Sequence, residues 1–547
     1  MSASSKKKLR NAQNAEVLTE KQRAEQAEAK KLKIYSIAFA VVIGLMVVVA
    51  AWTMISKTIA SSGIRERGTV AAVVGDHELN STELNYFYID AVNQFYSNYG
   101  SYAALFGLDV TKPLNEQVTD EEASTTWADD FMSTSLDNAA AVYALADEAA
   151  AQGYTLSEDE LAEIENNMSY VTMYAGIYGY TDAEGYIKAM YGNGATEESL
   201  REYYELTYLA DSFYNNYSDS LTYTDADLRA AEAENYDLYS SFSYNYYYLG
   251  VSKFYEGGTT DEEGNTTYSD AEIAAAEAAC KAAAEELAAG EYASVEEFNA
   301  AIAALPINAE ATSATSTACE DYSYSNVNSL YVDWIADDAR SAGDMTCVEN
   351  TSTTTDDAGN EETTVSGYYV VYFGSSNDNT YPLANVRHIL VAFEGGTTDD
   401  NGNTTYSDEE KAAAKEAAET LLAQWESGDA TEDSFAELAN AESDDGDGTT
   451  GGLYEDVYPG QMVTNFNDWC FDESRKTGDT GIVETEYGYH VMYYVGDSET
   501  NYRDYQITNA LVTEDSNAWY ASLVDVVETA LKDTKYISTD LVLSPEA

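Results

Sequence analysis

Three residue types are scarce in this chain of 547 residues, with 5 prolines, 4 cysteines and 3 histidines. So few prolines argue against proline-rich linkers between domains. The cysteines form no CxxC pair and no Cys/His cluster with metal spacing, so we predict no metal site. Cys280, Cys319 and Cys347 lie near one another in sequence, and a disulfide among them stays open.

Positive charge is also scarce. The chain has 27 Lys or Arg against 97 Asp or Glu, which gives a formal net charge of −70. Residues 1–33 hold nine Lys or Arg and four Glu, so the remainder carries −75. A surface this acidic repels phosphate backbones, and we therefore expect no nucleic-acid partner.

One long stretch, from Ile34 to Ser56, lacks charge altogether. It is long enough to cross a bilayer, for which about 20 apolar residues suffice. A cleaved signal peptide is the alternative, but its apolar core is usually about 7–15 residues and no clean A-x-A site follows here. We therefore predict an uncleaved signal anchor and a single-pass cell-membrane protein. The basic tail stays cytoplasmic by the positive-inside rule, and residues 57–547 are extracytoplasmic.

The pattern after this stretch is mainly helical. Residues 68–79 predict a short strand and turn, and the region from Ser81 to about Tyr239 predicts helices. Ser157 with Glu160 forms a capping box. Tyrosines recur at helical spacing, which fits either core positions or a tyrosine-rich groove for unfolded peptide. A final amphipathic helix is predicted near residues 519–532.

An internal repeat organises the remaining chain. Residues 255–290 and 393–423 begin with nearly the same sequence, and the likeness continues through a second helix and a closing strand. Two copies of one β-α-α-β-β unit therefore lie in tandem, at 241–376 and 384–497. In the loop 397–405, Asn-Gly between threonines predicts a small hairpin. Calcium binding at Asp399 is the alternative, although Thr404 stands where an EF-hand loop needs glycine.

The second copy contains a series of short motifs. They are Val386-Arg387-His388-Ile389-Leu390, Phe435-Ala436-Glu437-Leu438-Ala439, Ser443-Asp444-Asp445, Gly451-Gly452-Leu453, GQMVTNF at 460–466, Gly478-Asp479 and YGYHV at 487–491. In order and spacing, this series resembles the parvulin family of peptidyl-prolyl isomerases. The layout of the whole chain is similar to that of foldases of the PrsA and SurA type.

The resemblance implies a site for turning X–Pro bonds. It assigns the prolyl pocket to Leu453, Met462 and Phe466, and the polar centre to His388, Asp445, His490 and Thr485. The barrier to this rotation is about 18–20 kcal/mol, and no covalent bond breaks. We therefore expect no cofactor. The expected partners are unfolded or newly secreted polypeptides that contain X–Pro bonds.

The first copy departs from the family pattern. Its opening strand reads Tyr246-Tyr247-Tyr248-Leu249 without histidine, and Tyr369 replaces the second histidine. We therefore interpret it as a degenerate parvulin-like fold without isomerase activity.

The expected fold class is α+β, with a single N-terminal transmembrane helix, a helical SurA-like chaperone domain, two tandem parvulin-like domains and a C-terminal helix. The predicted boundaries are a basic tail at 1–33, the anchor at 34–56, the helical domain at 68–240, the degenerate repeat at 241–376, the isomerase domain at 384–497 and a helical segment at 502–547. The predicted function is a membrane-anchored isomerase and chaperone. The alternative is a non-catalytic holdase or scaffold that uses the parvulin folds only for binding. The sequence does not tell the oligomeric state.

Overall fold

The computed structural model describes residues 61–543 except 121–122, 262–263, 312, 356–360, 400–402, 447 and 473. Its described residues form two compact units, one of residues 61–221 with 514–543 and the other of residues 222–513.

The first unit is mainly helical, as its residue pattern predicts. A three-stranded sheet in the order β17-β1-β2 packs beside the helices. The predicted capping box is present, because the Ser157 side chain accepts from the Glu160 backbone N–H at the start of α6. The elements are α3 Ile64–Gly68, β1 Val70–Val74, β2 His77–Asn80, α4 Ser81–Tyr99, β3 Val118–Asp120, β4 Thr125–Thr126, α5 Trp127–Gln152, α6 Glu158–Ile177, α7 Ala183–Tyr191 and α8 Glu197–Ser220, with 3₁₀ turns η1 Gly100–Phe106 and η2 Leu114–Glu116.

The C-terminal helix differs from its prediction. The helix α16 begins at Tyr502 and ends at Val524, so residues 519–532 are not one helix. Beyond it, β17 Thr529–Leu531 pairs antiparallel with β1, with Ala72 opposite Leu531. The apolar residues after 524 therefore complete a sheet, which apolar periodicity over so short a stretch does not distinguish from a helix.

The predicted membrane anchor requires a correction. Residues 34–56 lie outside the described residues, and within 61–543 no helix is both long and apolar enough to cross a membrane. The helix α5 shows why: its 26 residues have sufficient length but include Asp129, Asp130 and Asp147. We therefore correct the fold class to a mixed α/β fold without a transmembrane helix in its described part. The single-pass membrane localisation is withdrawn with it.

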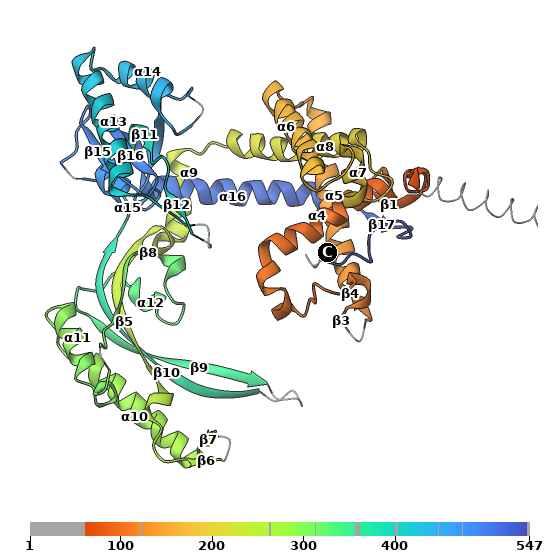
Figure 1. The fold of residues 1–547 in the computed structure, drawn as a ribbon. Coiled ribbons are helices and arrows are strands. Elements are labelled where there is room, and N and C mark those ends of the chain that lie inside the picture. Colours follow the sequence, from red (N-terminus) through yellow and green to blue (C-terminus); the bar gives the residue numbers. More distant parts are fainter. Residues whose placement is uncertain are drawn as a thin grey trace, which may run out of the picture. The chain divides into compact units, whose positions relative to one another are not determined.

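The second unit contains two four-stranded sheets with matching topology (Figure 1). The first repeat has the strand order β8-β5-β10-β9, and the second has β14-β11-β16-β15. The elements of the first repeat are β5 Ser241–Gly250, β6 Thr259–Thr260, β7 Thr266–Thr267, α10 Asp270–Ala288, α11 Val295–Ala303, β8 Thr317–Ser323, α12 Val332–Ile335, β9 Met345–Thr355 and β10 Glu361–Asn377. Those of the second are β11 Pro382–Ala392, β12 Thr397–Thr398, β13 Thr404–Thr405, α13 Asp408–Ser427, α14 Glu432–Glu442, β14 Leu453–Val457, α15 Thr464–Cys470, β15 Thr480–Glu484 and β16 Gly488–Asn501.

The expected hairpin and the possible disulfide have outcomes in the structure. The pairing of β12 with β13 makes the loop after Phe393 a hairpin, with Thr398 opposite Thr404. In the described residues, no group of three or more His, Cys, Asp or Glu side chains could hold a metal ion. All four cysteines are free thiols, so the disulfide does not form.

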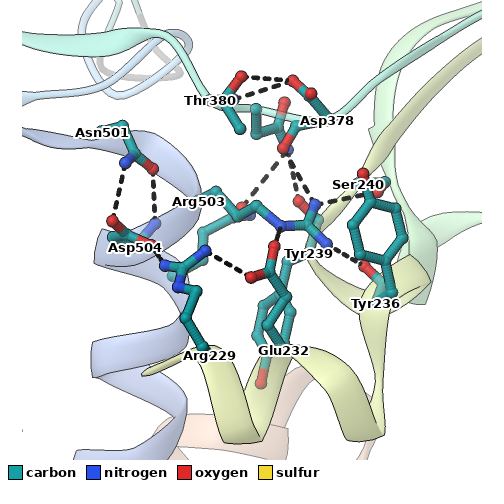
Figure 2. Close-up of polar contacts among 12 residues, drawn as sticks. Arg229, Glu232, Tyr236, Tyr239, Ser240, Asp378, Thr380, Asn501, Arg503 and Asp504 are labelled. Carbon is teal, nitrogen blue, oxygen red and sulfur yellow. Dashed lines mark hydrogen bonds and ion pairs between the residues drawn. The ribbon is translucent and has the colours of Figure 1, made fainter. Parts of the chain in front are cut away.

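A buried arginine joins the start of α16 to the chain on either side of the first repeat (Figure 2). The Arg503 side chain is 1% exposed and pairs with Glu232 at 2.5 Å. It also donates to Ser240 Oγ at 3.2 Å and to the carbonyls of Asp378 and Tyr236 at 3.0 and 2.6 Å. Glu232 belongs to α9 Asp225–Glu234, and Tyr236 to the 3₁₀ turn Tyr236–Tyr239. Three segments distant in sequence, 232–240, Asp378 and the start of α16, are thereby held at one point.

Candidate active site

Strand alternation brings two histidines together on one face of the second repeat's sheet. The strands β11 and β16 are antiparallel, with His388 opposite Met492 and Leu390 opposite His490. The two histidines are therefore diagonal neighbours whose side chains share a face. Residues of odd number, such as Ile389, point to the other face and pack in the core under α13 and α14.

The imidazoles are in direct contact. Their Nδ1 atoms lie 3.0 Å apart, and the side chains are buried. The Nε2 of His490 lies 2.9 Å from Thr485 Oγ1, and the Nε2 of His388 lies 3.2 Å from Asp445 Oδ2. All four residues predicted for the polar centre thus form one continuous chain of contacts.

The carboxylate determines how protons are arranged along this chain. The Asp445 carboxylate only accepts hydrogen bonds, so the Nε2 of a neutral His388 must carry the proton. The Nδ1 of His388 is then an acceptor, and His490 donates to it from its own Nδ1. The Nε2 of His490 in turn accepts from the Thr485 hydroxyl. One arrangement of neutral tautomers therefore satisfies every contact. In the reverse arrangement the Nε2 of His388 would carry no proton and would face the Asp445 carboxylate, so two acceptors would meet.

Burial keeps both imidazoles neutral. The pKa of His490 is lowered to about 4, first by burial and then by the neighbouring His388, while Asp445 opposes the shift. Burial also lowers the pKa of His388, with Asp445 again opposing. At neutral pH the site therefore presents neutral dipoles and one carboxylate rather than an imidazolium.

A tyrosine that the sequence analysis missed completes the polar centre. The Tyr454 hydroxyl donates to Asp445 Oδ2 at 2.9 Å, and its ring stacks on His388 with a centroid distance of 4.8 Å. Burial and the hydrogen bond to Asp445 raise the pKa of Tyr454 to about 12, so the hydroxyl keeps its proton. The only signal in the sequence was its place directly after Leu453.

Leu453 does not lie where the resemblance assigned it. In the pairing of β11 with β14, Leu453 is opposite Arg387 and Tyr454 is opposite Val386. Arg387 bonds to Glu432 of α14, so Leu453 shares the helix-covered face. A shift of one residue along a strand exchanges the two faces, and Tyr454 therefore takes the position assigned to Leu453.

The other two pocket residues lie on the site face. The Phe466 side chain, on α15, is 2% exposed and meets both imidazoles edge-on, with centroid distances of 5.5 Å to His388 and 5.4 Å to His490. Met462, just before α15, is half-buried and packs with Phe466 in the same apolar cluster. An apolar wall therefore stands beside the neutral imidazoles.

A glycine permits the close approach of β14 to the first histidine strand. Gly452 has φ +64°, and a Cβ there would lie 2.1 Å from the His388 carbonyl oxygen. The His388 N–H donates to the Gly452 carbonyl at 2.9 Å. Glycine is required here by both its backbone conformation and the contact, and it fixes the backbone of the histidine.

This arrangement coincides with a known domain family. The family model described as the PPIC-type PPIase domain matches residues 372–496. The second repeat is a parvulin-type peptidyl-prolyl isomerase domain. Domains of this kind bind peptides that contain proline, and the predicted isomerase is thereby confirmed.

Several solved structures are also similar. The PPIase domain of TbPar42 is 24% identical, with 20% of this chain and 98% of that chain covered and a TM-score of 0.17. The PrsA peptidylprolyl isomerase from Bacillus anthracis is 23% identical, with 27% of this chain and 59% of that chain covered and a TM-score of 0.17. PrsA from Bacillus subtilis is 13% identical, with 77% and 96% covered and a TM-score of 0.27. No curated protein matches the chain significantly in sequence.

Proposed function

We propose that the chain is a folding factor that turns X–Pro bonds at the histidine pair and holds unfolded segments on its helical unit. The isomerase proposal rests on one observation, the continuous chain from Thr485 through His490 and His388 to Asp445 beside the apolar wall.

The chemistry of the reaction explains why this site suits it. Rotation about the amide loses resonance but breaks no bond, so the site needs to favour the twisted amide over the planar one. In the proposal, the prolyl ring packs against Phe466, Met462 and Tyr454, and this packing excludes water from the amide. The neutral imidazole chain then provides hydrogen-bonding groups whose proton positions adjust as the carbonyl turns.

No nucleophile is required in this proposal. Cys470 lies behind Phe466 in the same apolar cluster, and its side chain is buried. Burial raises the pKa of its thiol to about 12, so little thiolate exists at neutral pH. Its role in the proposal is packing.

The test is refolding of an unfolded client whose slow phase is limited by a prolyl bond. The full chain should accelerate that phase, and His388→Ala should reduce the acceleration at least tenfold, equivalent to about 1.4 kcal/mol of transition-state stabilisation. His77→Gln is the matched control, because His77 lies in β2 of the other unit. Full acceleration by the His388 variant would remove the histidine pair from the mechanism.

A groove in the helical unit supports the holding function. It lies among α6, α7 and α8 and has a volume of about 390 Å³. Tyr170 and Tyr174, on α6, are 55% and 43% exposed along it. The lining residues are Asn167, Tyr170, Val171, Tyr174, Tyr186, Ile187, Met190, Tyr191, Leu200 and Tyr204. Tyrosine combines an apolar ring with a hydroxyl that can bond to a peptide backbone, which suits a site for varied sequences.

In this proposal, the acidic side chains near the groove determine which unfolded segments bind there. The helix α8 begins with Glu197 and Glu198, just before the lining residue Leu200, so the groove has acidic side chains at this end. Unfolded segments that combine aromatic or aliphatic residues with Lys or Arg fit such a rim better than acidic segments do.

An aggregation assay separates holding from isomerisation. The full chain should suppress aggregation of an unfolded client without a slow prolyl phase, and Tyr170→Ser with Tyr174→Ser should weaken suppression. Tyr102→Ser is the control, because Tyr102 is 61% exposed on η1 and does not line the groove. Equal suppression by the groove variant and the control would contradict the holding site while leaving the isomerase untouched.

A further inference from the structure

The first repeat keeps the strand register of the isomerase domain but has no histidine. In β5 and β10, Tyr248 is opposite Tyr369 and Tyr246 is opposite Val371. In the isomerase repeat the corresponding pairs are Leu390 with His490 and His388 with Met492. By register, Tyr246 therefore stands at the position of His388, and Tyr369 at the position of His490.

Three further positions around this point are also tyrosine. The register places Tyr244 at the position of Val386 and Tyr248 at the position of Leu390. Tyr331 precedes Trp334 by three residues, as Phe466 precedes Trp469. Five positions of the histidine site, the two histidines among them, are thus tyrosine in the first repeat. Since tyrosine makes up only 47 of the 547 residues, composition alone does not account for this.

The five rings form one continuous aromatic cluster. Tyr369 lies in its middle, with centroid distances of 5.8 Å to Tyr246, 4.8 Å to Tyr248 and 5.6 Å to Tyr331. Tyr331 and Tyr244 are buried beneath, whereas Tyr246, Tyr248 and Tyr369 are each partly exposed. We call these three exposed rings the tyrosine platform.

The apolar wall of the prolyl pocket is also retained below the platform. Val327 precedes Tyr331 by four residues, as Met462 precedes Phe466. Val327 and Tyr331 are both buried in the same cluster as Val371. Met462 and Phe466 therefore have buried counterparts in Val327 and Tyr331, whereas tyrosines replace both imidazoles.

We propose that the tyrosine platform binds extended proline-containing segments without turning their X–Pro bonds. Aromatic grooves bind such segments because a proline ring packs on an aromatic face and the extended backbone has free carbonyls for hydroxyl donors. The inference rests on the proposed function, since it assigns the same class of client to both repeats. A client held at the platform by one proline can then present another to the histidine pair.

The mutual packing of the rings favours proline over a cation as the ligand. Cation sites of high affinity surround the charge with several ring faces. Here the rings of Tyr248 and Tyr369 contact each other at 45° rather than enclosing a space, and an open platform suits a flat, uncharged ring.

Photo-crosslinking of the full chain tests the proposal. The probe is an alanine–proline peptide with one photoreactive group, and mass spectrometry locates the crosslinks. We expect crosslinks on β5 or β10 as well as in the second repeat. Tyr246→Ala with Tyr369→Ala should reduce the β5 and β10 crosslinks at least tenfold, whereas Tyr246→Phe with Tyr369→Phe should retain them because the ring faces remain.

Three outcomes would overturn the platform: crosslinks confined to the second repeat or the helical unit, equal labelling by a peptide with alanine in place of proline, or stronger labelling by one with lysine in its place. The isomerase rate of the same wild-type sample is measured in parallel. Loss of platform crosslinks with a normal isomerase rate refutes only this inference, and an absent isomerase rate refutes the proposed function instead.

Discussion

Lowering the pH tests the neutral state of the histidine pair. At about pH 5.5 a histidine with the ordinary pKa of about 6.5 is about 90% protonated, whereas a pKa of about 4 leaves about 3% protonated. Burial lowers the pKa of His490 to about 4 and also lowers that of His388. We therefore expect the isomerase rate at about pH 5.5 to stay close to its value at about pH 7.5, because His490 remains neutral there and burial shifts the pKa of His388 in the same direction.

The assay is NMR exchange spectroscopy on an alanine–proline peptide with the full chain between about pH 8 and pH 5. It needs no coupled protease, so pH acts on this chain alone. The range ends at about pH 5 because many of the 97 acidic side chains take up protons below it. With only 3 histidines, the imidazole signals can be assigned by single His→Gln variants and give the apparent pKa values of the pair directly. A rate that halves near pH 6.5, together with imidazoles that titrate there, would refute the neutral pair.

The same shift links pH to stability. The folded-state pKa of His490 lies below the unfolded value of about 6.5, so folding favours the neutral form. The contribution of His490 to the free energy of unfolding is therefore fully present above about pH 6.5. As the pH falls toward about 4, the free energy of unfolding decreases by up to about 3 kcal/mol from this residue. His490→Gln should therefore flatten part of the acid side of the stability curve.

Three further predictions concern the pocket, the buried arginine and the substrate. Phe466→Leu should lower the isomerase rate about tenfold while costing less than about 1.5 kcal/mol of stability, as measured by exchange spectroscopy and thermal unfolding. Arg503→Met should cost about 2–3 kcal/mol, because it removes the donor of the Ser240, Asp378 and Tyr236 hydrogen bonds and leaves Glu232 with Arg229 alone. Arg201→Met, on an exposed ion pair, should cost about 0–1 kcal/mol. Denaturant unfolding followed by circular dichroism compares the two variants, and equal midpoints would contradict a structural role for Arg503. Residues 394–410 hold six acidic and no basic side chains, so a phospho-Ser–Pro peptide should turn over more slowly than its Ser–Pro counterpart, by a margin that shrinks in high salt; faster turnover of the phosphopeptide would contradict the charge argument.

The polar centre could be predicted because strand periodicity and the family motifs agree. His388 and His490 fall on strands whose even-numbered residues share one face, and the structure places Asp445 and Thr485 at either end of the pair. The helix caps of the first unit were equally visible, since Ser157 and Glu160 have the spacing that a capping box requires.

The remaining features depend on tertiary contacts that the sequence does not encode locally. Tyr454 rather than Leu453 faces the site, because the register of an edge strand is set by pairing across the sheet. The apolar residues after Val524 form β17 rather than a helix, because β1 offers an open edge for pairing. Arg503 gave no signal at all, since its partners come from segments up to 271 residues away.

The most direct test of the central claim compares two histidine variants of the full chain in the exchange assay. The account predicts that wild type and His77→Gln accelerate cis/trans exchange of the alanine–proline peptide equally, and that His490→Gln loses at least tenfold with its thermal unfolding largely unchanged at neutral pH. Equal rates for His490→Gln and His77→Gln would contradict the assignment of isomerisation to the histidine pair.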